Sequence, residues 1–120
     1  MEPVITEPGV QAFADGASFC IRDWRGSGPA VLHVHHDDDE AWHVLEGTLR
    51  FTFGDRVLEA AAGATVFVPA GVAHTYVALE GSRYLLILTP RLRDLIAELQ
   101  TNSDLSAHPE IYRRHRSEIV

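Results

Sequence analysis

The stretch that decides the fold is HVHHDDDE at residues 33–40, which carries two histidines two positions apart and a glutamate shortly after them. Side chains at positions i and i+2 of a strand point to the same face, so we expect His33 and His35 to project together. Glu40 follows a short acidic turn and opens the apolar run 41–45. This order lets its carboxylate turn back toward the two imidazoles.

A second short segment farther along the chain adds a third imidazole. His74 lies just past a Pro-Ala-Gly turn, at the start of another predicted strand. Burying these rings and a carboxylate together without a cation would be costly, at roughly 1–3 kcal/mol for each unsatisfied ring nitrogen and more for the charge. The mixed nitrogen and oxygen donors suit Fe, Mn, Ni, Cu, Co or Zn. We therefore predict a divalent transition-metal site made by four residues: His33, His35, Glu40 and His74.

The first group of these residues resembles the first motif of the cupin family. That motif runs glycine, five residues, His-x-His, three or four residues, glutamate, six residues, glycine. Here the fit is carried by His33, His35, Glu40 and Gly47, whereas Gly28 stands one residue too close to be the leading glycine. Because the family tolerates two spacings before the carboxylate, the preceding aspartate, residue 39, is the one serious rival to Glu40.

The second group resembles the second cupin motif, which runs glycine, five residues, Pro-x-Gly, two residues, histidine, three residues, asparagine. Gly63, Pro69, Gly71 and His74 match it without a gap, and Ala78 replaces the terminal asparagine. The resemblance implies a single small all-β domain, a double-stranded β-helix or jelly-roll barrel, over residues 1–90. Residues 91–120 are expected to form a helical tail packed on the outside of the barrel.

The rest of the chain agrees with an all-β fold. Turn signals rich in glycine, proline and aspartate recur at short intervals between runs of valine, leucine, phenylalanine and tyrosine, which is typical of a sandwich or barrel. Residues 49–53 alternate strictly between apolar and polar side chains, as a half-buried strand does. The 120 residues are enough for one domain with a core.

After Pro90 the period of the pattern changes. Leu92, Leu95, Ile96 and Leu99 follow helical spacing and predict an amphipathic helix over residues 91–101, with the preceding Thr89 as its N-cap. A second short helix is predicted from residue 108 or 109 to residue 117. The two histidines of this tail, at positions 108 and 115, are expected to be solvated.

Two predicted strands do not alternate. Residues 65–68 and 84–88 are apolar on both faces, which is typical of strands covered on both sides. In a barrel of this size, the outer face can be covered only by the tail or by another subunit. We therefore predict a homodimer, as the resemblance to small cupins also implies. His36 and His43 are expected on the outward faces, in surface, packing or dimer contacts.

Four aromatic residues are candidates for the walls of a ligand pocket. Trp42 and Tyr76 each stand two residues from a proposed ligand and so share its inward face. A place in the barrel core is the favoured interpretation of both. The functional alternative has them lining a pocket together with Phe51 and Phe53, with the Tyr76 hydroxyl available for a hydrogen bond or proton transfer. Such a pocket predicts a small organic ligand.

Four protein ligands would leave a six-coordinate metal with about two open positions, the pattern of a catalytic site. The resemblance to small cupins implies dioxygenases, isomerases and decarboxylases among the possible activities. Our first hypothesis is a metal-dependent oxidoreductase, dioxygenase-like, that acts on a small oxygenated organic compound, with Glu40 as a possible proton acceptor. A non-catalytic module that binds or senses a small molecule is the alternative.

Composition limits the possible partners and location. The net charge is −7 and all ten basic residues are arginine, so an acidic chain without a basic stripe argues against nucleic acid as a partner. No apolar run approaches the roughly 20 residues of a membrane span. The lone Cys20 and the absence of a visible signal peptide lead us to expect a cytoplasmic protein.

Overall fold

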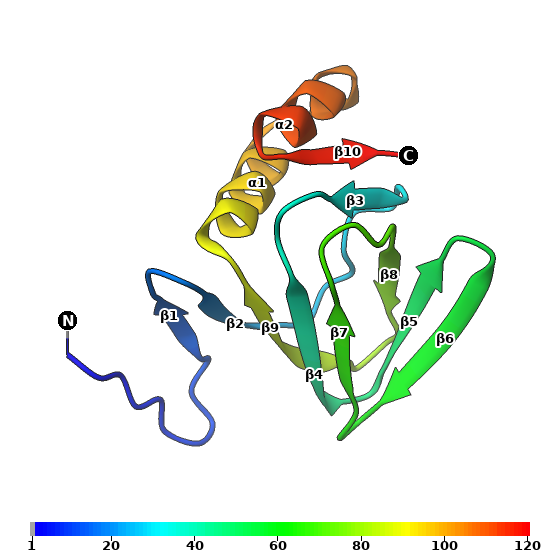
Figure 1. Ribbon diagram of the computed structural model, residues 1–120. Coiled ribbons are helices and arrows are strands. Elements are labelled where there is room, and N and C mark those ends of the chain that lie inside the picture. The colour runs from blue at the N-terminus through cyan, green and yellow to red at the C-terminus, as the bar shows by residue number, and fades with distance from the viewer. Residues whose placement is uncertain (1) are drawn as a thin grey trace.

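The computed structural model describes residues 2–120 and shows a β-barrel whose end is covered by C-terminal helices (Figure 1). The elements follow one another as β1 (Phe13–Asp15), β2 (Cys20–Trp24), β3 (His33–His35), β4 (Glu40–Glu46), β5 (Thr48–Phe53), β6 (Arg56–Ala61), β7 (Thr65–Val68), β8 (Thr75–Ala78), β9 (Arg83–Leu88), α1 (Pro90–Thr101), the 3-10 helix η1 (Leu105–Ala107), α2 (His108–Arg114) and β10 (Ser117–Ile119). Within the described residues, no helix is long and apolar enough to cross a membrane.

The strands form three antiparallel sheets. The largest has the order β1-β2-β9-β4-β7, a second has the order β6-β5-β8, and β3 pairs with β10 in a third. The two larger sheets face each other, while β3 and β10 lie across one end of the barrel (Figure 1). A bridge between His33 and His74 links β3 to the start of β8. This arrangement confirms the predicted all-β jelly-roll fold.

Alternating side chains of the two larger sheets fill the core. Trp42, Tyr84 and Leu86 come from the five-stranded sheet, and Leu49 and Phe51 from the three-stranded sheet; all five are fully buried. Burial of each such side chain contributes roughly 1.5–3 kcal/mol to the stability of the fold. The strict alternation of β5 thus places its apolar residues inward, as its sequence predicts.

The first helix of the tail begins where the sequence predicts. The hydroxyl of Thr89 accepts a hydrogen bond from the backbone N–H of Leu92 at 3.2 Å, and Pro90 occupies the first turn. The apolar side chains Leu92 and Leu95 are buried. The tail was expected to pack on the outside of the barrel, and α1 lies over one end of it, where β9 ends (Figure 1).

The last residues differ from the prediction. The second helix ends at Arg114 instead of continuing to residue 117, and Ser117–Ile119 form β10. Arg116 has a left-handed backbone (φ 57°), which breaks the helix and turns the chain back along β3. Ser117 is then opposite His35, and Ile119 is opposite His33.

Candidate metal centre

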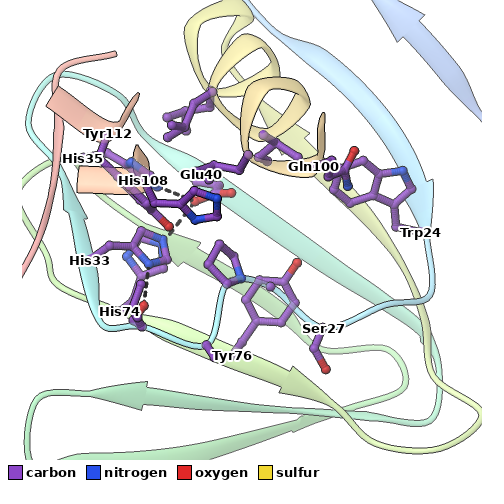
Figure 2. A pocket seen from close by; sticks show the side chains of 18 of the residues that line it. Trp24, Ser27, His33, His35, Glu40, His74, Tyr76, Gln100, His108 and Tyr112 are labelled. Carbon is purple, nitrogen blue, oxygen red and sulfur yellow. Dashed lines mark hydrogen bonds and ion pairs between the residues drawn. The ribbon is translucent and has the colours of Figure 1, made fainter. Parts of the chain in front are cut away.

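Three strands bring the predicted ligands together. His33 and His35 project inward from β3, His74 precedes β8, and Glu40 is the first residue of β4. The backbones of His33 and His74 exchange two hydrogen bonds of 3.1 and 2.9 Å, which fixes β3 against β8 at this point. One ligand nitrogen from each of the three histidines lies within 4.8 Å of the other two, and all four side chains are buried (Figure 2).

Backbone carbonyls fix the orientation of two of the rings. Nδ1 of His33 donates to the carbonyl oxygen of Val31 at 2.9 Å, and Nδ1 of His74 donates to that of Val72 at 2.9 Å. A carbonyl oxygen can only accept, so Nδ1 of each ring carries the proton. The lone pair of a neutral ring is then on Nε2, which is the nitrogen available to a metal.

The third ring is oriented by the C-terminal strand. Nδ1 of His35 lies 2.7 Å from the hydroxyl oxygen of Ser117. That hydroxyl donates its own proton to the carbonyl oxygen of His115 at 3.3 Å, so it accepts from the ring. His35 therefore also presents Nε2.

The carboxylate of Glu40 faces two of these nitrogens. Its Oε1 is 3.3 Å from Nε2 of His35 and 3.2 Å from Nε2 of His74. Burial raises the pKa of Glu40, and the His35 and His74 rings lower it when they carry a proton at Nε2. Burial lowers the pKa of His33 to about 4, which keeps that ring neutral.

The three histidine nitrogens could hold a metal ion, and Oε1 of Glu40 lies beside two of them. Unprotonated ring nitrogens and a carboxylate oxygen repel one another when nothing lies between them, and burial weakens the screening of that repulsion. A cation among the three Nε2 atoms and Oε1 would satisfy every lone pair at once. Three imidazoles and one carboxylate are also the donor types that Fe, Mn, Ni, Cu, Co and Zn accept.

The other acidic and histidine side chains of this region lie elsewhere. Asp39, the rival carboxylate, is exposed and accepts a hydrogen bond from the backbone N–H of Ala70 at 2.9 Å. His36 points outward, as predicted, with Nε2 3.1 Å from Glu118. His43 lies on the outer face, where its Nδ1 is 2.7 Å from the hydroxyl of Thr65.

A cavity of about 360 Å³ lies against the four ligands. Of the four aromatic residues predicted to line a pocket, Tyr76 alone does so. Trp42 is fully buried in the core, which was its favoured interpretation, as is Phe51, and Phe53 stacks on Phe51; none of the three lines this cavity. One part of the barrel interior is packed core and another part is the cavity. Strand alternation predicts which side chains point inward, but it does not predict which of these two parts they enter.

The hydroxyl of Tyr76 is engaged within the protein. The hydroxyl of Tyr84 donates to the carbonyl oxygen of Gly26, so the 2.8 Å contact between the two phenols requires Tyr76 to donate to Tyr84. Burial raises the pKa of Tyr76 well above its usual value, and the neighbouring Tyr84 is the second cause of this increase. Its proton therefore faces Tyr84, and the proton-transfer role predicted for it has no support in this geometry.

Sequence reasoning missed the contribution of the tail to the site. Tyr112 of α2 is buried with its ring 5.5 Å from that of His33, and it lines the cavity. His108 also lines the cavity, and its Nε2 is 2.8 Å from the carbonyl oxygen of Asn102. His115 is half-buried against Glu98. Both histidines were expected to be solvated, and both instead contact other residues of the tail. The apolar pair at residues 111–112 signals burial in the sequence, but not proximity to β3.

The family of the chain follows from comparison with known proteins. The profile of the cupin domain matches residues 23–89. An uncharacterized protein of Streptomyces coelicolor is 38% identical over 56 residues, which are 46% of this chain and 53% of that protein. Mannose-1-phosphate guanylyltransferase 2 of Escherichia coli O157:H7 is 36% identical over 44 residues, 37% of this chain and only 9% of the enzyme. The match thus spans about half of the first relative and a small part of the second.

Solved structures share the fold. KdgF from Halomonas sp. superimposes with a TM-score of 0.58 at 23% identity, covering 77% of this chain and 90% of that one. A cupin-2 domain containing protein from Shewanella frigidimarina gives a TM-score of 0.52 at 29% identity, covering 69% and 82%. Since the profile spans more than half of the 120 residues and agrees with the barrel and its histidines, the chain belongs to the cupin family.

Proposed function

We propose that this protein binds one divalent transition metal and acts as a metal-dependent oxidoreductase, dioxygenase-like, on a small organic substrate. The observation that carries the proposal is the convergence of three histidine nitrogens beside a cavity, with the Glu40 carboxylate 3.3 and 3.2 Å from two of them. The proposed ligands are His33, His35, Glu40 and His74.

The chemistry would be shared between the metal and the side chains. The metal would supply a Lewis acid or an electron source for dioxygen at coordination positions that the protein leaves open. The residues of the cavity would bind the substrate, orient its donor atoms toward the three rings and keep water away from them. Glu40 is also placed to receive a substrate proton.

Metal content is the first test of this proposal. Elemental analysis of the untagged wild type should find about one transition metal per chain, and the double variant His33→Ala/His74→Ala should hold none. His36→Ala is the matched control, because this histidine is on the same strand region but points outward, and it should retain the metal. Absence of metal from the wild type, even after reconstitution with Fe(II), Mn(II), Ni(II) and Zn(II), would overturn the proposal.

One observation favours the alternative, a module that binds or senses a small molecule without turnover. The hydroxyl of Tyr76, which was predicted to transfer a proton, donates to Tyr84 and is not turned to a ligand in the cavity. Saturable ligand binding by the metal-loaded protein under oxygen, with no oxygen uptake and no product, would support the binding module against the enzyme.

We also propose that the protein forms a homodimer through the outer face of its five-stranded sheet. An apolar row crosses four strands of this face, because Ile21 pairs with Ile87, Ile87 with Ala41, and Ala41 with Phe67. Phe67 is 55% exposed, and a row of this length on a free surface would cost solvation free energy. A second copy of the same sheet would cover it.

The predicted lack of a nucleic-acid partner and the predicted cytoplasmic location remain part of the proposal. The net charge of −7 supports the expectation that nucleic acid is not a partner. Cys20 is fully buried and has no second cysteine among the 120 residues, which is compatible with the predicted cytoplasmic location.

A further inference from the structure

We infer that the ligand of this cavity is a small, mainly apolar molecule with one oxygen-donor end and no second charged group. This inference rests on the proposed metal site, and it adds the chemical class of the compound that the site would take. Three features of the cavity carry it: its two ends, its walls and its charge.

The cavity has a polar inner end and an exposed opposite end. The four proposed ligands are together on one side of Figure 2, with Tyr112 beside them, and all are buried. Trp24, Ser27 and Gln100 lie on the other side, and of these Ser27 and Gln100 are exposed. A ligand entering past them would reach the rings with one end only.

The walls between the two ends are apolar. Helix α1 supplies Leu92, Leu95, Ile96 and Leu99 from one side. The loop between β2 and β3 supplies residues 29–31, a proline, an alanine and a valine. The volume of about 360 Å³ lies near the lower end of the roughly 300–1,000 Å³ typical of pockets for small organic ligands. A body such as one aromatic ring or a short alkyl chain matches these walls.

The charge of the lining excludes polyanions. Glu40 is the one carboxylate among the lining residues, no arginine lines the cavity, and the chain has no lysine. Outside the proposed ligands, the one histidine of the lining is His108, whose Nε2 donates to the carbonyl oxygen of Asn102. A phosphate or a second carboxylate on the ligand would be buried against leucine and isoleucine side chains without an arginine or lysine partner. The single donor end is different, because it would be neutralised at the metal.

A matched pair of chelators tests the inference. Benzohydroxamate and acetohydroxamate share the same oxygen-donor head and differ only in the apolar body. We expect the zinc-loaded protein to bind benzohydroxamate at least tenfold more tightly in isothermal titration, because the ring would be removed from water against α1. The 4-carboxy derivative of benzohydroxamate, which adds one charge to the body, should bind at least tenfold more weakly than benzohydroxamate.

Two variants locate the apolar wall. Leu99 is half-buried and lines the cavity, so Leu99→Gln should weaken benzohydroxamate binding severalfold and leave acetohydroxamate binding within twofold of the wild type. Val77→Gln is the matched control, because Val77 is 50% exposed on β8 and does not line the cavity; it should change neither affinity. Thermal unfolding of both variants verifies that they fold.

The outcomes separate this inference from the proposed function. If the protein holds zinc but binds the two hydroxamates within twofold of each other, the ligand class is wrong and the metal site stands. If Leu99→Gln folds and leaves the preference for benzohydroxamate unchanged, the ring does not lie against α1 and the inference is overturned. If no zinc is held, the proposed function is wrong and this inference falls with it.

Discussion

The hydroxyl oxygen of Ser117 lies 2.7 Å from Nδ1 of His35, a contact between residues 82 positions apart in the chain. It exists because β10 pairs with β3 in a register that places Ser117 opposite His35. Both side chains are buried. A strand at the very end of the sequence therefore orients one of the proposed metal ligands.

Removing this hydroxyl should weaken the metal site. In Ser117→Ala, Nδ1–H of His35 loses its acceptor in a buried place, so the ring is free to turn. Partners of metal-bound histidines typically contribute about 10- to 100-fold to metal affinity. We expect the dissociation constant for Zn(II), measured by competition with a chelator, to rise by about tenfold. Ser117→Thr keeps a hydroxyl and should stay near the wild type; equal affinity of all three proteins would contradict the role of Ser117.

The glycine nearest the start of the first motif has a steric role. A Cβ atom on Gly28 would lie 2.3 Å from Cε1 of Tyr76, so the loop before β3 packs directly on that ring. Gly28→Ala should lower the free energy of unfolding by about 1–3 kcal/mol in urea denaturation, because either the loop or the ring must move. Gly26→Ala is the control, since nothing lies within 4 Å of the added atom. Equal stabilities of the two variants would refute the close contact.

The proposed dimer can be tested on its apolar row. Phe67→Glu places a charge at one end of the apolar row, on edge strand β7, and should convert the dimer to a monomer in size-exclusion chromatography with light scattering. Val57→Glu, at a position 58% exposed on β6 of the other sheet, should leave the dimer intact. A wild-type monomer at micromolar concentration, or a dimer that Val57→Glu disrupts instead, would rule out the proposed surface.

The sequence predicted what depends on local spacing and missed what depends on distant contacts. The pair His33 and His35 shares a face because strands repeat every two residues, and His74 was found through its distance from a Pro-x-Gly turn. β10 was missed because three residues are too short to show alternation. Tyr112 was missed because helical spacing gives a buried face but not the surface that this face meets.

Asp23 and Arg83 form an ion pair outside the proposed metal site. Asp23 is 5% exposed and accepts two hydrogen bonds from the Arg83 guanidinium, at 2.9 and 2.7 Å. These bonds hold the pKa of Asp23 below its usual value of 3.8. The pair joins β2 to β9 in the middle of the five-stranded sheet.

The sign of the resulting pH dependence follows from this shift. A carboxyl with a lowered pKa in the folded state contributes stability that is fully present above pH 3.8, where the unfolded chain is also ionised, and is lost as pH falls through the folded pKa. Asp23→Asn should therefore reduce the free energy of unfolding at pH 7 by about 1–3 kcal/mol. The difference from the wild type should shrink as urea denaturation is repeated from pH 5 toward pH 2. Asp55→Asn is the control, because Asp55 lies in the exposed turn between β5 and β6, and its free energy of unfolding should follow that of the wild type at every pH. If the difference in free energy between Asp23→Asn and the wild type stays constant with pH, packing and not the charge is responsible.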